Sequence, residues 1–181
     1  MLHLGYILLV SLSMFHPADS IVAPTEKPFG SVIRTVREVE MTGDTTAEIL
    51  QIETTKSKLF NKILVRFGIY SKAGKPLYRD EWKASSYFDP IDQLPDTIKW
   101  RRLERILRNY FVNRNFLMDS DETLKAIFER AQPVDIKLES AEAKEFTATP
   151  HKIYSVFAGR DELYGLTWLD SKKRFVKVWK N

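Results

Sequence analysis

Histidine, the side chain most often used for acid–base catalysis near neutral pH, is scarce in this sequence. The 181-residue chain has three histidines and no cysteine. Two of them, His3 and His16, lie in an apolar N-terminal segment, which leaves His151 for a mature protein. No Gly-x-Ser-x-Gly motif supplies a nucleophile, and zinc normally needs three or four suitable ligands. The pattern therefore disfavours a Ser-His-Asp triad and a zinc site, and indicates that His151 is a surface loop residue.

Carboxylates are the only abundant acid–base groups in the sequence, and two clusters of them stand out. Asp89, Asp92 and Asp96 recur along a loop that contains two prolines. Residues 119–122, Asp-Ser-Asp-Glu, superficially suggest a calcium loop, but Leu124 occupies the position where such a loop requires glycine. Loop solvation and helix capping explain both clusters better than a metal site or a glycosidase-type pair. The sequence therefore predicts no catalytic residue, no metal and no cofactor.

A basic stretch is the clearest functional signal. Its cations recur at helical spacing and comprise Lys99, Arg101, Arg102, Arg105 and Arg108. A basic amphipathic helix is typical of binding to an anionic membrane surface or an acidic partner. The alternative is a solvated helix face whose arginines pair with acids such as Glu104. Nucleic acid is disfavoured as a partner, because no RNP, KH or helix-turn-helix signature is present.

The apolar residues of the same stretch predict a helix from Asp96 that continues for about twenty residues. Pro95 and Asp96 supply the start signal. The apolar stripe expected to face a sheet comprises Ile98, Leu103, Ile106, Leu107, Tyr110, Phe111 and Leu117. A second helix is predicted to follow over residues 119–131, and Pro133 would end it.

The rest of the chain shows the alternation and turn residues of strands. Before the helices, strands are predicted within residues 31–42, 47–55, 62–71 and 77–83; after them, within 134–140, 152–158, 162–170 and 174–180. Tight turns between neighbouring strands favour antiparallel pairing. The predicted fold class is therefore α+β: one twisted antiparallel sheet, built from an N-terminal and a C-terminal strand block, packed on a central pair of helices. A bent sheet and a half-open barrel both fit this pattern.

Aromatic residues on these strands suggest a second functional possibility. Tyr78, Trp82, Tyr154 and Trp168 fall at alternating strand positions, where rings either fill the core or line a concave pocket. In the second case the ligand would be small and apolar or sugar-like.

Composition and the N-terminal segment bear on location. The net charge is +4 and the hydrophobic fraction is 44%, as in an ordinary globular domain. Residues 4–15 form an apolar run typical of a signal peptide, and Ala18 and Ser20 are small residues that predict cleavage near Ser20. Without cysteines or glycosylation sequons, an exported domain over residues 21–181 indicates a bacterial periplasmic or secreted protein.

Together these observations predict a non-enzymatic interaction or accessory module of the bacterial envelope. Its expected partner is an envelope protein or an anionic membrane surface. The alternative prediction is a small-ligand-binding domain with an aromatic-lined pocket in the curved sheet. The sequence leaves the oligomeric state open.

Overall fold

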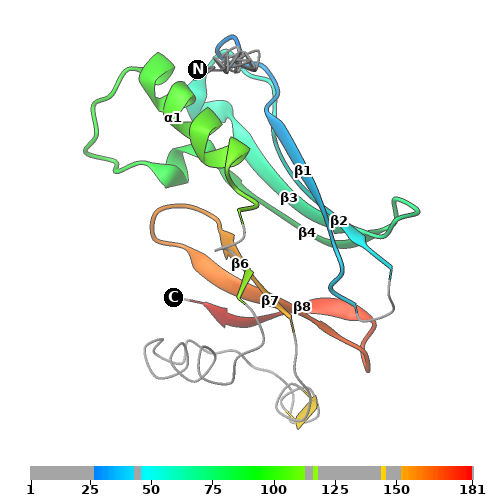
Figure 1. The fold of residues 1–181 in the computed structure, drawn as a ribbon. Coiled ribbons are helices and arrows are strands. Elements are labelled where there is room, and N and C mark those ends of the chain that lie inside the picture. Colours follow the sequence, from blue (N-terminus) through cyan, green and yellow to red (C-terminus); the bar gives the residue numbers. More distant parts are fainter. Residues whose placement is uncertain (1–26, 43–45, 113–115, 118–143, 146–151, 181) are drawn as a thin grey trace, which may run out of the picture.

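The computed structural model describes residues 27–42, 46–112, 116–117, 144–145 and 152–180 (Figure 1). Its elements are, in chain order, β1 (Arg34–Val39), β2 (Glu48–Thr54), the 3₁₀ helix η1 (Phe60–Lys62), β3 (Leu64–Tyr70), β4 (Pro76–Lys83), the 3₁₀ helix η2 (Ala84–Tyr87), α1 (Asp96–Arg108), β5 (Phe116–Leu117), β6 (Ile153–Phe157), β7 (Leu163–Leu169) and β8 (Arg174–Lys180). The fold class is α+β, as predicted.

The first sheet has the strand order β1-β2-β3-β4, and all its pairs are antiparallel. Alternation in the sequence explains its strands, since Val65, Phe67 and Ile69 of β3 are buried on one face while Arg66 lies exposed on the other. The β3–β4 hairpin turns at residues 71–75, where Gly74 has a φ of 79°, a left-handed conformation that favours glycine. The four predicted N-terminal strands and this hairpin are confirmed.

The second sheet is an antiparallel meander of β6, β7 and β8, with the two-residue β5 paired to the free edge of β6. The three C-terminal strands are confirmed. The strand predicted over residues 134–140 lies outside the described residues. Leu117, predicted to belong to the first helix, is instead in β5.

The prediction of a single sheet is wrong, because the two strand blocks form two separate sheets. Figure 1 shows them as two layers, with α1 at one end of the first sheet. Phe67 on the inner face of β3 stacks on Tyr154 of β6, with ring centroids 5.7 Å apart. Each block has an apolar face, and stacking these faces buries both without joining the sheets by hydrogen bonds.

The helix prediction also needs correction. One α-helix, α1, is present in the described part of the chain, and it ends at Arg108 after 13 residues. Tyr110 and Phe111 continue the apolar periodicity, yet they lie beyond the helix and pack in the core. The second helix predicted over residues 119–131 lies outside the described residues, so the described part of the chain holds one helix rather than the predicted pair.

The chain beyond α1 connects it to the second sheet. The Tyr110 hydroxyl accepts a hydrogen bond from the Phe157 amide at 2.9 Å and donates one to the Phe157 carbonyl at 3.0 Å. Tyr87 of η2 donates to the same carbonyl at 2.7 Å. Because both tyrosines hold the end of β6, the helix and the second sheet form one packed unit.

Candidate functional site

The basic surface of α1 is the first candidate, and the structure places most of its cations toward solvent. Arg101, Arg102 and Arg105 are exposed, whereas Lys99 is half-buried. The opposite side of the helix is buried through Trp100, Leu103 and Leu107. Since residues three and four apart share a face of a helix, this inward stripe forces the three arginines outward. We call Arg101, Arg102 and Arg105 the basic surface.

Glu104, one of the two acids of this helix, does not lie on the basic surface. Glu104 is 4% exposed and faces inward, a burial that the sequence analysis did not predict. Its Oε1 accepts hydrogen bonds from Arg108 at 2.6 and 3.1 Å and from the Lys27 amide at 3.2 Å. The i,i+4 spacing of Glu104 and Arg108 was the signal that could have indicated this pair. Arg108 is therefore held by Glu104, although its side chain is still 39% exposed.

Ile106 departs from its predicted position on the buried stripe. It is 36% exposed and follows Arg105 on the outer side of the helix. Ile91, in the loop before α1, is 85% exposed. Of these two residues, Ile106 follows Arg105 in α1 and so adds one exposed apolar side chain to the basic surface.

The four aromatic residues of the predicted pocket are placed in different surroundings. Tyr154 is buried, and Tyr78 packs on Phe67 at a centroid distance of 6.1 Å. Trp82 is half-buried against the core, while Trp168 packs edge-to-face on Phe175 and donates to Asp170 at 3.0 Å. Phe67 thus lies beside both tyrosines, but none of the four predicted rings lines either of the two cavities described below. The aromatic pocket stays a prediction.

A polar cluster that the sequence analysis missed joins the two sheets around Asp80 of β4. Asp80 Oδ2 accepts from the hydroxyls of Tyr164 at 2.6 Å and Tyr78 at 3.2 Å, and from the Lys177 ammonium at 3.0 Å. Lys177 also lies over the Tyr164 ring, 3.9 Å from its centroid. We call these four residues the Asp80 cluster. No sequence motif indicates it, because its members come from three strands of two sheets.

The electrostatics of the Asp80 cluster follow from its contacts. Burial acts to raise the pKa of Asp80, but the hydrogen bonds from Tyr164 and Lys177 outweigh it, and the pKa lies below the ordinary 3.8. Burial raises the pKa of Tyr78 and of Tyr164, so both phenols stay protonated as donors. Asp80 Oδ1 also accepts from the Glu81 amide at 2.9 Å. Both oxygens of Asp80 therefore accept hydrogen bonds within the protein, and those from Tyr164 and Lys177 link the first sheet to the second.

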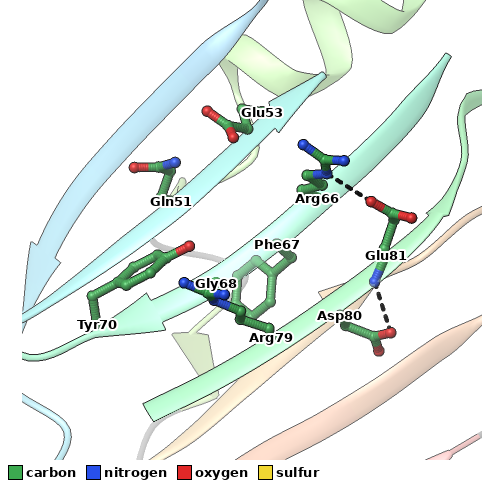
Figure 2. Close-up of a pocket in the computed structure, with 9 residues that line it drawn as sticks. All are labelled: Gln51, Glu53, Arg66, Phe67, Gly68, Tyr70, Arg79, Asp80 and Glu81. Carbon is green, nitrogen blue, oxygen red and sulfur yellow. Dashed lines mark hydrogen bonds and ion pairs between the residues drawn. The ribbon is translucent and has the colours of Figure 1, made fainter. Parts of the chain in front are cut away.

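The outer face of the first sheet carries a groove of about 570 Å³ (Figure 2). Gly68 leaves space for the Tyr70 side chain, because a Cβ at Gly68 would lie 2.6–2.8 Å from atoms of the Tyr70 phenol. The Arg79 guanidinium lies 5.6 Å from the centroid of that ring, and Arg66 pairs with Glu81 at 2.6 Å. The lining holds two arginines and three carboxylates, so this groove offers polar contacts without an excess of positive charge.

A second cavity of about 660 Å³ lies where the end of β4, the start of α1 and the β6–β7 turn meet. Gly159 in that turn approaches η2 closely, since a Cβ there would lie 2.7 Å from Ser86 Oγ. Ser86 Oγ donates to the Ala158 carbonyl at 2.7 Å, which fixes the turn against η2. We call this the inter-sheet cavity.

The predicted carboxylate clusters show no metal-binding arrangement in the described part of the chain. Asp89 accepts a hydrogen bond from the Ile91 amide at 3.0 Å and pairs with Arg160. The hydrogen bond from the backbone is the larger of the two effects that hold the pKa of Asp89 below its ordinary value, and the Arg160 contact is the smaller. Asp96 occupies the first turn of α1 without a side-chain capping bond, where its charge complements the helix dipole. Among the described residues no three potential ligands gather. Residues 119–122 and His151 lie outside them.

No helix in the described residues is long and apolar enough to cross a membrane. Comparisons of the chain with protein-family models, with curated proteins and with solved structures found no match.

Proposed function

We propose that this chain is a non-enzymatic interaction module, exported to the bacterial envelope, which binds an anionic partner through the basic surface of α1. The observation that carries the proposal is the division of charge on this helix. Arg101, Arg102 and Arg105 are exposed, while Glu104 is buried and holds Arg108. The exposed Ile106 beside them gives the surface an apolar contact as well.

The partner is an envelope protein or an anionic membrane surface. Basic residues gain about 1 kcal/mol each near an anionic lipid surface, and exposed apolar side chains add affinity by entering it. An acidic protein surface would use the same arginines through bidentate hydrogen bonds to carboxylates.

The test is a double substitution, Arg102→Gln with Arg105→Gln. Exposed ion pairs contribute about 0–1 kcal/mol each, so the variant should fold like the parent chain. Its binding to vesicles that contain phosphatidylglycerol, or to a partner crosslinked in envelope extract, should fall strongly. Binding by the parent chain should weaken as salt rises, because screening acts on exposed charges.

A charge-matched control comes from the β3–β4 turn. Lys72→Gln with Lys75→Gln removes the same charge from exposed positions away from α1. This control should keep its binding. If both variants lost the same amount of binding, the loss would come from the lower net charge of the protein and not from the basic surface, which would contradict the proposal. Undiminished binding by the arginine variant would refute it as well.

Export is part of the proposal and has its own measurement. Residues 4–20 carry the composition of a signal peptide, which predicts a mature chain that starts at Ile21. Mass spectrometry of the native protein should find that terminus in an envelope fraction. An intact Met1 in a cytosolic fraction would contradict it.

A further inference from the structure

The inter-sheet cavity has walls from separate parts of the chain. β4 contributes Lys83, α1 contributes Lys99 and β8 contributes Lys180, while the remaining lining comes from η1, η2, the loop after η2 and the β6–β7 turn. A cavity of about 660 Å³ is in the range that holds a small organic molecule. The packing of α1 and both sheets therefore determines its shape.

The acids of the cavity already have cationic partners. Glu162 pairs with Lys180 at 2.9 Å, and Asp89 pairs with Arg160. Arg160 also lies 3.8 Å from Asp161, whose side chain is 91% exposed and so largely screened by water. Counting Arg160, four cations face three carboxylates.

Lys83 and Lys99 are the cations left over. Among the described residues, no ion pair engages either ammonium. Lys83 belongs to β4 and Lys99 to α1, and both line the same cavity. The lining of the cavity therefore includes two cations that no carboxylate of the described residues neutralises.

Two aromatic rings, those of Phe60 and Phe88, give the inter-sheet cavity an apolar part. Phe60 is buried and meets Phe88 edge-to-face, with centroids 5.5 Å apart. Phe88 is half-buried and lines the cavity together with Pro90. An apolar wall beside two free ammonium groups is complementary to a molecule that has an apolar part and an anionic part.

We propose that the inter-sheet cavity binds a small amphiphilic anion, whose phosphate or carboxylate pairs with Lys83 and Lys99 and whose apolar part packs on Phe60 and Phe88. The outer-face groove in Figure 2 is a weaker candidate for an anion, because three carboxylates line it against two arginines. This site is separate from the basic surface, since Arg102 and Arg105 do not line the cavity.

The probe is hexyl phosphate, titrated into the full chain by calorimetry, with hexanol and inorganic phosphate as partial probes. Hexyl phosphate should bind at least about tenfold more tightly than either, since it alone offers both the chain and the charge. Hexanoate, titrated in parallel, distinguishes a phosphate from a carboxylate preference. Equal affinity for inorganic phosphate and hexyl phosphate would overturn the apolar half of the proposal.

Three variants test the residues. Lys83→Gln and Lys99→Gln should each weaken hexyl phosphate binding by about threefold to tenfold, because each removes one charge-assisted contact. Lys75→Gln removes the same charge from the distant β3–β4 turn and should bind like the parent chain. Undiminished binding in both cavity variants, or no binding by the parent at about 10 mM probe, would overturn the proposal.

The Arg102→Gln, Arg105→Gln variant separates this proposal from the proposed function. It should bind hexyl phosphate normally while it loses its anionic partner. Loss of hexyl phosphate binding in that variant, with normal binding in the two lysine variants, would assign the anion to the basic surface and overturn the cavity site.

Discussion

At the scale of single residues, two buried or half-buried carboxylates show how context decides the role of a charge. Glu104 is held by Arg108 within one helix, whereas Asp80 is held by Tyr164 and Lys177 across two sheets. Both are paired, as an ion removed from water requires. Both therefore contribute to the fold, and neither pairs with Arg102 or Arg105 of the basic surface.

Asp80→Asn should destabilise the protein in a pH-dependent way. The pKa of Asp80 in the folded state lies below 3.8, so its stabilising contribution is complete above that value and is lost as the pH falls through the folded pKa. At neutral pH the substitution should cost about 1–3 kcal/mol, because it weakens charge-assisted hydrogen bonds. Urea unfolding between neutral and acidic pH measures the difference.

The difference between Asp80→Asn and the parent chain should shrink below pH 3.8. Asp92→Asn, an exposed loop carboxylate, is the control and should show little effect at any pH. A difference that stays constant through the acid range would contradict the assigned role of the Asp80 charge.

At the scale of elements, α1 shows that hydrophobic periodicity locates a helix better than it assigns each residue to a face. The start at Asp96 was predictable from Pro95 and the following pattern. Ile106 belongs to the predicted stripe but is exposed, and Trp100, which the stripe omitted, is 1% exposed. Helical spacing gives the direction in which each side chain points from the helix axis. How many of these directions are buried depends on the surface against which the helix packs.

Leu107→Ala and Ile106→Ala form a matched pair of substitutions on neighbouring residues. Leu107 is 0% exposed, so its truncation should cost about 2–5 kcal/mol by leaving a cavity. Ile106 is 36% exposed, and its truncation should change stability by about 1 kcal/mol or less. Chemical denaturation measures both, and equal costs would contradict the orientation of α1.

At the scale of the whole molecule, the two sheets share one core. Phe67 from the first sheet contacts Tyr154 from the second, and Tyr110 lies beside both the ring of Phe67 and the backbone of Phe157. A core shared in this way predicts cooperative unfolding, in which far-UV circular dichroism and tryptophan fluorescence change together.

Tyr110→Phe should lower the stability of the protein more than Tyr87→Phe, although both hydroxyls bind the backbone of Phe157 at the end of β6. Loss of the Tyr110 hydroxyl removes the acceptor of the Phe157 amide, which should cost about 1–3 kcal/mol. Loss of the Tyr87 hydroxyl costs less, because Tyr110 still donates to the same carbonyl. Thermal unfolding of the two variants measures the order of their effects. A larger loss of stability in Tyr87→Phe would contradict the roles assigned to the two hydroxyls.

The sequence by itself determined the α+β class, seven of the described strands, the β3–β4 hairpin and the start of α1. Strand alternation, a proline before a helix and a glycine in a turn act over a few neighbouring residues, so they can be recognised locally. The basic stretch was likewise visible, because helical spacing places its five cations, Lys99, Arg101, Arg102, Arg105 and Arg108, on one helix.

Only the tertiary structure decided that the strand blocks stack as two sheets, that α1 ends at Arg108, and that Tyr154 lies in the core. It also brought Lys83, Lys99, Phe60 and Phe88 to one cavity and Asp80 to Lys177. These outcomes depend on contacts between residues far apart in the chain, and their free energy comes from how whole faces fit. Local periodicity specifies which face of an element is apolar, but not which other face will cover it.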